Sequence, residues 1–338
     1  MLPALSPAEL ERALRDPAST ERCSSLFGEP AVLVDLAAEP PPEARDAHAW
    51  QRLGELPAVS VGVATAGVAP GAGALAEALD LVVRSPSELE AVLETAERRP
   101  LAALVLVQLL RRSLSRDVAE GLLAESLAYS TLQAGPEFAA WRAARRERKR
   151  EPDAEPAVLA RREGEELRLE LNRPHKRNAF SAEMRDALCE ALVLVIQDAS
   201  LRRVVLSGAG PSFCSGGDLD EFGSLPDPST AHAIRSTRNA AALLARVAER
   251  VEARVHGACV GAGAELPAFC RRVVAAPSAF FLLPEVGMGL VPGAGGTVSL
   301  PRRIGRQRAA WLALTGRRLP AEDALAWGLV DEIAAWRR

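Results

Sequence analysis

Two glutamates stand out in the C-terminal half of the chain because each lies in an apolar stretch. Glu265 begins an otherwise apolar segment, ELPAF, and Glu285 lies in FFLLPEVGMGL among apolar residues, proline and glycine. A carboxylate is costly to bury as a charge, so a buried one has a raised pKa and is a catalytic candidate. An exposed position for each is the alternative, and it would carry no functional meaning.

Glycine-containing loops precede both acids. Residues 207–219, SGAGPSFCSGGDL, hold four glycines, and residues 260–265 read VGAGAE. The first loop lacks the Gly-Lys-Ser/Thr ending of a P-loop, and the second lacks the third glycine of a dinucleotide-binding loop. Glycines let bare backbone N–H groups approach a ligand, and two converging N–H groups form an oxyanion hole. Tight turns are the alternative interpretation of these loops.

The elements that position these residues follow from the hydrophobic pattern of the C-terminal half. It predicts strands at 167–174 and 202–210, and a strand–loop–helix–strand run over 251–276. Ser181 is expected to cap a helix whose apolar face carries Met184 and Leu188. This alternation predicts a layered α/β domain.

The N-terminal half also alternates, with a larger share of helix. Buried strands are predicted for the apolar runs 31–36, 58–64 and 79–83. Helices are predicted over 88–98, 101–112 and 117–149. Ser87 is expected to cap the first helix, and the last is expected to break at Gly135-Pro136 and to bury Leu123, Leu127 and Leu132.

A charged segment with two prolines, ERKREPDAEPAVLARRE (147–163), separates the halves. Prolines interrupt helices, and 338 residues are comfortable for two domains. We therefore expect an N-terminal α/β domain over 1–155 and a second domain over 156–338.

Composition excludes several classes of function. The net charge of −3 and the single short basic cluster at 142–150 give no indication of a nucleic-acid partner. Five cysteines without a CxxC pair predict neither a disulfide framework nor a metal site. The N-terminus does not resemble a signal peptide, and no long apolar run predicts a membrane span. We expect a cytoplasmic protein without a membrane partner.

Residues 167–331 resemble the enoyl-CoA hydratase/isomerase (crotonase) superfamily. The resemblance is carried, in order, by LNRPHKRNAFS (171–181), VVLSGAGPSFCSGGDLDEF (204–222), VHGACVGAGAELPAFC (255–270), FFLLPEVGMGLVPGAGGTVSLPRRIG (280–305) and LTGRRLPAEDALAWGLVDEI (314–333). It implies a crotonase-like spiral of ββα units and an acyl-CoA thioester substrate. It also implies chemistry without a separate cofactor or metal, and a homo-oligomer, either a trimer or a hexamer.

The resemblance assigns roles by position. Gly217 and Ala262 fall where the family places the two oxyanion N–H groups, although Ala262 replaces a usual glycine. Glu265 and Glu285 fall on the two hydratase acids, with the expected separation (285 − 265 = 20). Other positions match residues that line the water site or contact coenzyme A: Gly293, Ser215, Asp218, Leu219, Lys176 and Arg177.

Two further departures from the family pattern concern the residues after Cys270 and the C-terminal end of the chain. Arg271 and Arg272 replace an acidic residue that is common after Cys270, which puts a structural ion pair there in doubt. The chain ends at Arg338, where relatives usually continue with helices that cover the acyl pocket. Residues 119–152 resemble that ending, so we expect the N-terminal half to be a degenerate crotonase-like unit whose helices at 117–149 form a lid. An unrelated α/β cap is the alternative.

Three functions are compatible with these residues. Hydration of a 2-enoyl-CoA, or the reverse dehydration, uses both glutamates and is favoured by their presence, which would make the protein a lyase of fatty-acid metabolism. Double-bond isomerisation, or other chemistry of a CoA enolate including that of the cofactor-free dioxygenase branch, is the second. A non-catalytic subunit that binds CoA esters or serves assembly is the third.

Overall fold

The computed structural model of the protein describes residues 3–26, 29–44, 47–145, 155–224 and 227–335. The predicted boundary near residue 155 follows a segment, 146–154, that lies outside the described residues, as does most of the basic cluster at 142–150. None of the described helices is both long enough and apolar enough to span a membrane. All five cysteines are free thiols.

A three-stranded parallel sheet forms the centre of the N-terminal part, in the order β1-β2-β3. Its strands are β1 (Ala31–Asp35), β2 (Val59–Val63) and β3 (Leu81–Val83). The helices around and after it are α1 (Pro7–Arg15), α2 (Ser19–Arg22), η1 (Pro42–Ala44), η2 (Ala47–Glu55), α3 (Gly73–Ala78), α4 (Pro86–Arg98), α5 (Pro100–Arg111), α6 (Val118–Gln133) and α7 (Pro136–Ala143).

The C-terminal part contains two sheets. The larger has the order β12-β9-β7-β6-β5-β4, with β4 antiparallel to β5 and the other neighbours parallel. Its strands are β4 (Val158–Glu163), β5 (Glu166–Leu171), β6 (Arg203–Gly208), β7 (Val251–Val255), β9 (Arg272–Ala275) and β12 (Glu332–Ile333). The smaller has the order β11-β10-β8, formed by β8 (Ala258–Val260), β10 (Phe280–Leu282) and β11 (Leu319–Pro320).

Helices cover these sheets and separate their strands along the chain. They are η3 (Pro174–Lys176), α8 (Ala182–Gln197), α9 (Pro228–Thr237), α10 (Ala240–Val247), η4 (Ala248–Arg250), α11 (Ala262–Glu265), η5 (Pro267–Phe269), η6 (Val286–Met288), α12 (Gly296–Ile304), α13 (Arg306–Thr315) and α14 (Ala321–Trp327). The predicted α/β class is confirmed, and Ser181 caps α8 by accepting a hydrogen bond from the N–H of Met184.

Two expectations for the N-terminal half are wrong. Ser85, not Ser87, caps α4, because Ser85 and Glu88 have the Ser-x-x-Glu spacing of a capping box and exchange both of its hydrogen bonds. Leu123 and Leu127 are 53% and 49% exposed, whereas Leu132 is buried. The side of α6 that faces the rest of the molecule carries Leu122, Glu125 and Leu132 instead.

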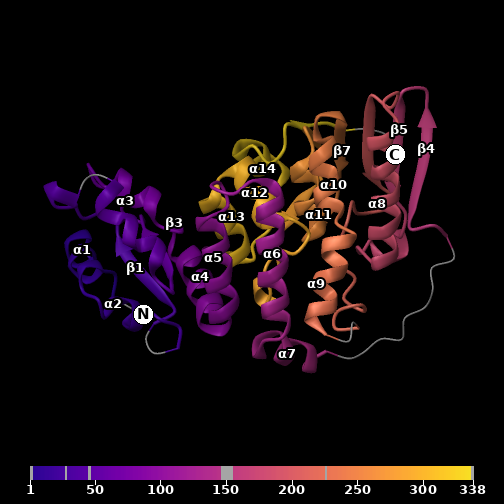
Figure 1. Ribbon diagram of the computed structural model, residues 1–338. Coiled ribbons are helices and arrows are strands. Elements are labelled where there is room, and N and C mark those ends of the chain that lie inside the picture. Colours follow the sequence, from indigo (N-terminus) through magenta and orange to yellow (C-terminus); the bar gives the residue numbers. More distant parts are fainter. Residues whose placement is uncertain (1–2, 27–28, 45–46, 146–154, 225–226, 336–338) are drawn as a thin grey trace.

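Helix α6 crosses the middle of the molecule (Figure 1) and packs against α9, α10 and α12 of the C-terminal part. Helices α4 and α5 pack against α13. One continuous cluster of buried apolar residues therefore extends through both parts, while a second cluster lies around α1, η2 and the N-terminal sheet. Arg272 pairs with Glu252 and Glu332. An ion pair therefore does form after Cys270, with a basic residue in the position where the family usually has an acidic one.

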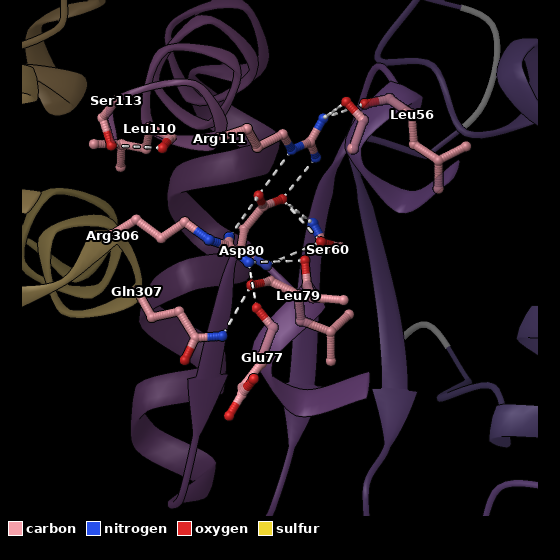
Figure 2. Close-up of polar contacts among 12 residues, drawn as sticks. Leu56, Ser60, Glu77, Leu79, Asp80, Leu110, Arg111, Ser113, Arg306 and Gln307 are labelled. Atoms are coloured by element: carbon pink, nitrogen blue, oxygen red, sulfur yellow. Dashed lines mark hydrogen bonds and ion pairs between the residues drawn. The ribbon is translucent and has the colours of Figure 1, made fainter. Parts of the chain in front are cut away.

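A buried ion-pair network joins the two parts at the base of β3 (Figure 2). Both oxygens of Asp80 accept hydrogen bonds from the guanidinium of Arg111, at 2.8 and 2.7 Å, and Oδ2 also accepts from the N–H and Oγ of Ser60. From α13, Arg306 lies 3.9 Å from Asp80, and Gln307 donates to the carbonyl of Leu79 at 2.9 Å. The first residues of α13 are thus held against the N-terminal sheet.

Candidate active site

A cavity of about 230 Å³ lies where α6 meets the C-terminal part. Its wall includes Gly217, which lies in the glycine loop 207–219 that is predicted to supply an oxyanion N–H (the oxyanion loop), together with the start and end of α11, Glu285, and the loop that leads into α12. Residues of α6 and α9 line the opposite side. The cavity therefore draws its wall from both halves of the chain.

Glu265 is brought to the cavity by a sharp change of chain direction. Gly261 has a φ of 50°, a conformation that favours glycine, and it ends β8 and starts the short helix α11. Glu265 is the last residue of α11 and is 2% exposed. Its Oε2 accepts hydrogen bonds from the N–H groups of Ala294 at 2.7 Å and Gly296 at 2.8 Å.

Glu285 reaches the same cavity from the segment between β10 and η6. Its main-chain carbonyl accepts from the N–H groups of Met288 and Leu290, which fixes the backbone of this turn. The side-chain Oε2 is buried and has no hydrogen-bond partner in the described part of the chain. Two predicted acids therefore line one cavity, one with two donors and one with a free oxygen.

A third carboxylate, that of Glu125 on α6, also lines this cavity and is 2% exposed. Its Oε1 accepts from the N–H of Gly295 at 2.7 Å. Its Oε2 accepts from the N–H of Thr297 at 2.9 Å and from the hydroxyl of Thr297 at 2.7 Å. Glu125 thus binds the first turn of α12, which has no side-chain cap of its own.

Burial shifts the titration of all three acids. Burial raises the pKa of Glu265 well above its usual range, and the nearby carboxylates of Glu285 and Glu125 raise it further against the two N–H donors. Burial raises the pKa of Glu285 to about 8, with Glu125 adding to the shift. For Glu125, burial raises the pKa to about 7, although hydrogen bonds from Thr297 and Gly295 oppose it. Such clustered shifts are typical of acid–base sites.

The two predicted oxyanion donors also lie at this cavity. Neither Gly217 nor Ala262 donates its backbone N–H to another group in the part of the chain that the structure describes. A Cβ on Gly217 would lie 2.8 Å from the ring of Phe222, so glycine is required there by close packing. Ala262 is the first residue of α11 and has helical backbone angles, which suit an L-residue. Its replacement of glycine therefore leaves the N–H available.

Comparison with known proteins agrees with this geometry. Residues 164–337 match the enoyl-CoA hydratase/isomerase family model. A 1,2-epoxyphenylacetyl-CoA isomerase from Escherichia coli (strain K12) is 38% identical over 180 residues, which are 52% of this chain and 69% of that protein. A mevalonyl-coenzyme A hydratase from Beauveria bassiana is 36% identical over 49% of this chain and 62% of that protein. The chain spans less than two thirds of the length of this hydratase.

A solved structure gives the same result. The crystal structure of an enoyl-CoA hydratase from Mycobacterium smegmatis shares 35% identity, with a TM-score of 0.50, over 54% of this chain and 71% of that one. The chain belongs to the enoyl-CoA hydratase/isomerase family. The match covers the C-terminal half, so Glu125 and the rest of α6 come from a part of this family member that the family model does not cover.

The predicted water-site residue and the predicted coenzyme A contacts of this family member are only partly brought together. Gly293, expected at the water site, and Asp218, an expected coenzyme A contact, line the cavity, whereas Ser215, Lys176 and Arg177 do not. The carboxylate of Asp218 lies 2.9 Å from Arg173 and 3.6 Å from Lys176, and Lys176 also pairs with Asp220 at 3.1 Å. These ion pairs stiffen the oxyanion loop.

The loop carrying Ser215 and Leu219 continues into a neighbouring hollow. Ser215 donates its N–H to the carbonyl of Arg177 at 3.0 Å. Leu219 lines a separate hollow beside α7, with Trp141, Arg142 and Phe222 in its wall. Trp141 also lies 6.1 Å from Phe222, centroid to centroid, so α7 contacts the oxyanion loop through aromatic rings.

The sequence predicted that helices over 117–149 cover the pocket, but it did not single out the polar groups that α6 brings to the cavity, Glu125 and Gln133. The ring of Tyr129 lies under the guanidinium of Arg235 at 4.7 Å, and Oε1 of Gln133 is buried without a partner among the described residues. A usable signal was present, because Glu125 lies in GLLAESLAYS and is as isolated among apolar and small residues as Glu265 is. The criterion that selected the two predicted acids would have selected it too.

Proposed function

We propose that this protein hydrates a 2-enoyl-CoA thioester, or dehydrates the corresponding 3-hydroxyacyl-CoA. The proposal rests on one arrangement: two backbone N–H groups without acceptors share a cavity with two buried carboxylates. A thioester carbonyl accepting from Gly217 and Ala262 becomes a better electron sink. The enolate that forms carries more charge than the carbonyl, so these donors stabilise the transition state more than the ground state.

The carboxylates of Glu265 and Glu285 supply the proton transfers. A water held between them loses a proton to one carboxylate while its oxygen bonds to the β-carbon. The double bond becomes the enolate, and the other glutamate, protonated, delivers its proton to the α-carbon. One proton is taken up and one is released, so the pair ends with the charge with which it began.

The hydrogen bonds favour one assignment of the shared proton. Neighbouring buried carboxylates do not all ionise together. Two N–H groups donate to Glu265 and stabilise its ionised form, whereas the Glu285 carboxyl has only the bond from its own N–H and its Oε2 has no donor among the described residues. We infer that Glu265 removes the proton of water and that Glu285 protonates the α-carbon.

The relatives support the reaction class and leave an isomerase as the second candidate. They include proteins named as a mevalonyl-coenzyme A hydratase, a 2,3-dehydroadipyl-CoA hydratase and a 1,2-epoxyphenylacetyl-CoA isomerase. The similarity to the last favours isomerisation, which needs one acid–base group. The hollow lined by Leu219, Arg142 and Arg145 is suited to the negatively charged nucleotide end of coenzyme A.

The test is turnover of a panel of 2-enoyl-CoA thioesters, followed by loss of the conjugated enoyl absorbance. Glu265→Gln and Glu285→Gln should each lower kcat by about 100-fold or more, because each removes an acid–base group, while ligand binding changes little. Glu183→Gln, at an exposed position in the first turn of α8, is the control and should leave kcat unchanged. Hydration at the wild-type rate by either variant would refute the assignment. Loss of activity in one variant alone would instead favour the isomerase.

A further inference from the structure

Four consecutive backbone N–H groups at the start of α12 are divided between two carboxylates. The N–H groups of Ala294 and Gly296 donate to Glu265, at 2.7 and 2.8 Å. Those of Gly295 and Thr297, which alternate with them, donate to Glu125 at 2.7 and 2.9 Å. The same short loop therefore joins an acid of α11 to an acid of α6.

This loop is too tightly packed for one set of bonds to change alone. A Cβ on Gly296 would lie 2.7 Å from Cγ of Glu265, and Gly295 has a φ of 99°. Glu125 uses each oxygen on a different N–H, so it fixes both the position and the rotation of the loop. An amide has an NH2 donor in place of one of these two oxygens, and that donor would face an N–H group, so it cannot make both bonds in this geometry.

We propose that Glu125 is a positioning residue, which holds the loop 294–297 so that Oε2 of Glu265 stays aimed into the cavity. The N-terminal half thereby takes part in the reaction through a buried carboxylate, beyond covering the acyl pocket. This inference rests on the proposed function, because it assigns Glu125 to the site in which Glu265 acts as the base.

Contacts beside Glu125 hold α6 in the rotation that this role requires. Oγ of Ser126 accepts from Nε of Arg235 at 3.0 Å and lies 2.9 Å from Nδ1 of His232. Oγ of Ser130, one turn later, accepts from Nη2 of Arg235 at 2.5 Å. Helix α9 is thus bonded to the same stretch of α6 that carries Glu125.

The polar groups around Glu125 determine what its removal does to the titration of the site. They are the guanidinium of Arg235 and the ring of His232 on α9, the phenol of Tyr129 on α6, and the two acids Glu265 and Glu285. A negative charge on Glu125 raises the pKa of both Glu265 and Glu285. Removing that charge should lower both pKa values, so the pH profile of kcat should move to lower pH.

Glu125→Gln tests the proposal, with Glu137→Gln as the matched control. Glu137 is also a carboxylate of the lid helices that binds a helix start, because it accepts from the N–H groups of Leu101 and Ala102 at 2.8 and 3.1 Å, and it does not line the cavity. Glu125→Gln should lower kcat by about 10-fold or more through misalignment of Glu265, with little change in KM. Its kcat–pH profile should move to lower pH, and that of Glu137→Gln should match the wild type.

A second variant and a second measurement distinguish failure of the proposed role of Glu125 from failure of the proposed function. Thr297→Val removes only the hydroxyl donor, so it should shift the profile in the same direction by less. The ¹³C titration of the Glu265 carboxyl, assigned with Glu265→Gln, should move to lower pH in Glu125→Gln even if no substrate is turned over. A wild type without hydratase activity but with that shift would refute the proposed function alone. An unchanged titration and an unchanged profile would overturn the role of Glu125.

Discussion

The two halves of the chain contribute buried acids to one cavity in different ways. In the C-terminal half, Glu265 and Glu285 lie within motifs whose glycine loops are close to them in the sequence. In the N-terminal half, Glu125 has no such motif, and its hydrogen-bond partner Gly295 is 170 residues away. A functional residue can be predicted from a sequence when its partners are close to it along the chain. It is difficult to predict when only the folded structure brings distant partners to it.

The N-terminal half also shows what separates a structural acid from a site acid. Asp80 and Glu125 are both 2% exposed. Asp80 has the guanidinium of Arg111 on both oxygens, so its charge is neutralised where it lies. Glu125 is held by N–H and hydroxyl groups, and it raises the pKa of two further carboxylates, Glu265 and Glu285. Burial alone is therefore a weak criterion, and the guanidinium bonded to both oxygens of Asp80 is what distinguishes the structural acid.

The largest effect is expected when the halves are separated. Residues 156–338 expressed alone would expose the apolar surface that packs on α6, where Val298 approaches Gly121 closely enough to exclude a Cβ there. They would also leave the first turn of α12 without Glu125. We expect this fragment to lack cooperative unfolding and activity, as followed by circular dichroism during a urea titration. Co-expression with residues 1–155 should restore both, and a stable, fully active fragment would show that the lid helices are dispensable.

A smaller effect is expected from breaking the network between the halves. Asp80→Ala leaves the guanidinium of Arg111 buried without its carboxylate, which should lower the free energy of unfolding by about 3–5 kcal/mol. The control is Glu94→Ala, which removes an exposed ion pair with Arg98 on α4 and should cost about 0.5 kcal/mol or less. Chemical denaturation of both variants measures the difference. Equal losses would mean that this buried network contributes no more to stability than an exposed ion pair does.

The sequence predicted the fold well where local signals were strong. Strands β1, β2, β3, β5, β6, β7 and β9 follow from apolar runs, and the cap at Ser181 follows from a side chain one turn from its target. Strands β4, β10, β11 and β12 were not predicted. The cap of α4 was misplaced by two residues, because Ser85 and Ser87 lie on either side of the first helical residue, Pro86, and only the distance to Glu88 distinguishes them. The inward face of α6 was also misassigned, since leucines occur all around this helix and its burial depends on partners from α9 and α12.

The residues of the site, like the elements of the fold, were predictable where the signal is local in the sequence. Family motifs identified residues that now share a cavity, among them Gly217, Ala262 and Gly293. They did not reveal that the carboxylate of Asp218 is engaged by Arg173, because Arg173 lies in another motif and its side-chain direction is set by the fold. The structure describes residues 117–145 of the expected lid and places α6 in the wall of the cavity, and a lid function for these helices stays a prediction. Whether the N-terminal half descends from a crotonase unit stays a prediction.

The smallest effect is expected on the outward face of α6. Leu123→Lys places a charge at a position that is 53% exposed, so the free energy of unfolding should change by no more than about 0.5 kcal/mol. Leu122→Lys, one residue away on the buried side, is the contrasting variant and should be strongly destabilising. Thermal and chemical denaturation compare the two. A large loss for Leu123→Lys would show that this face is covered in solution.

The order of the two halves along the chain has a consequence for synthesis. Glu125 leaves the ribosome 170 residues before Gly295, a delay of roughly 10–30 s at typical elongation rates of about 5–20 residues per second. During that time α6 has no α12 to bind, and the Glu125 carboxyl is hydrated, with a pKa near 4.5. The later half must then dehydrate that carboxylate as it closes on it. Completion of the cavity is therefore a late event of biogenesis, and it raises the pKa of the Glu125 carboxyl as water is removed from it.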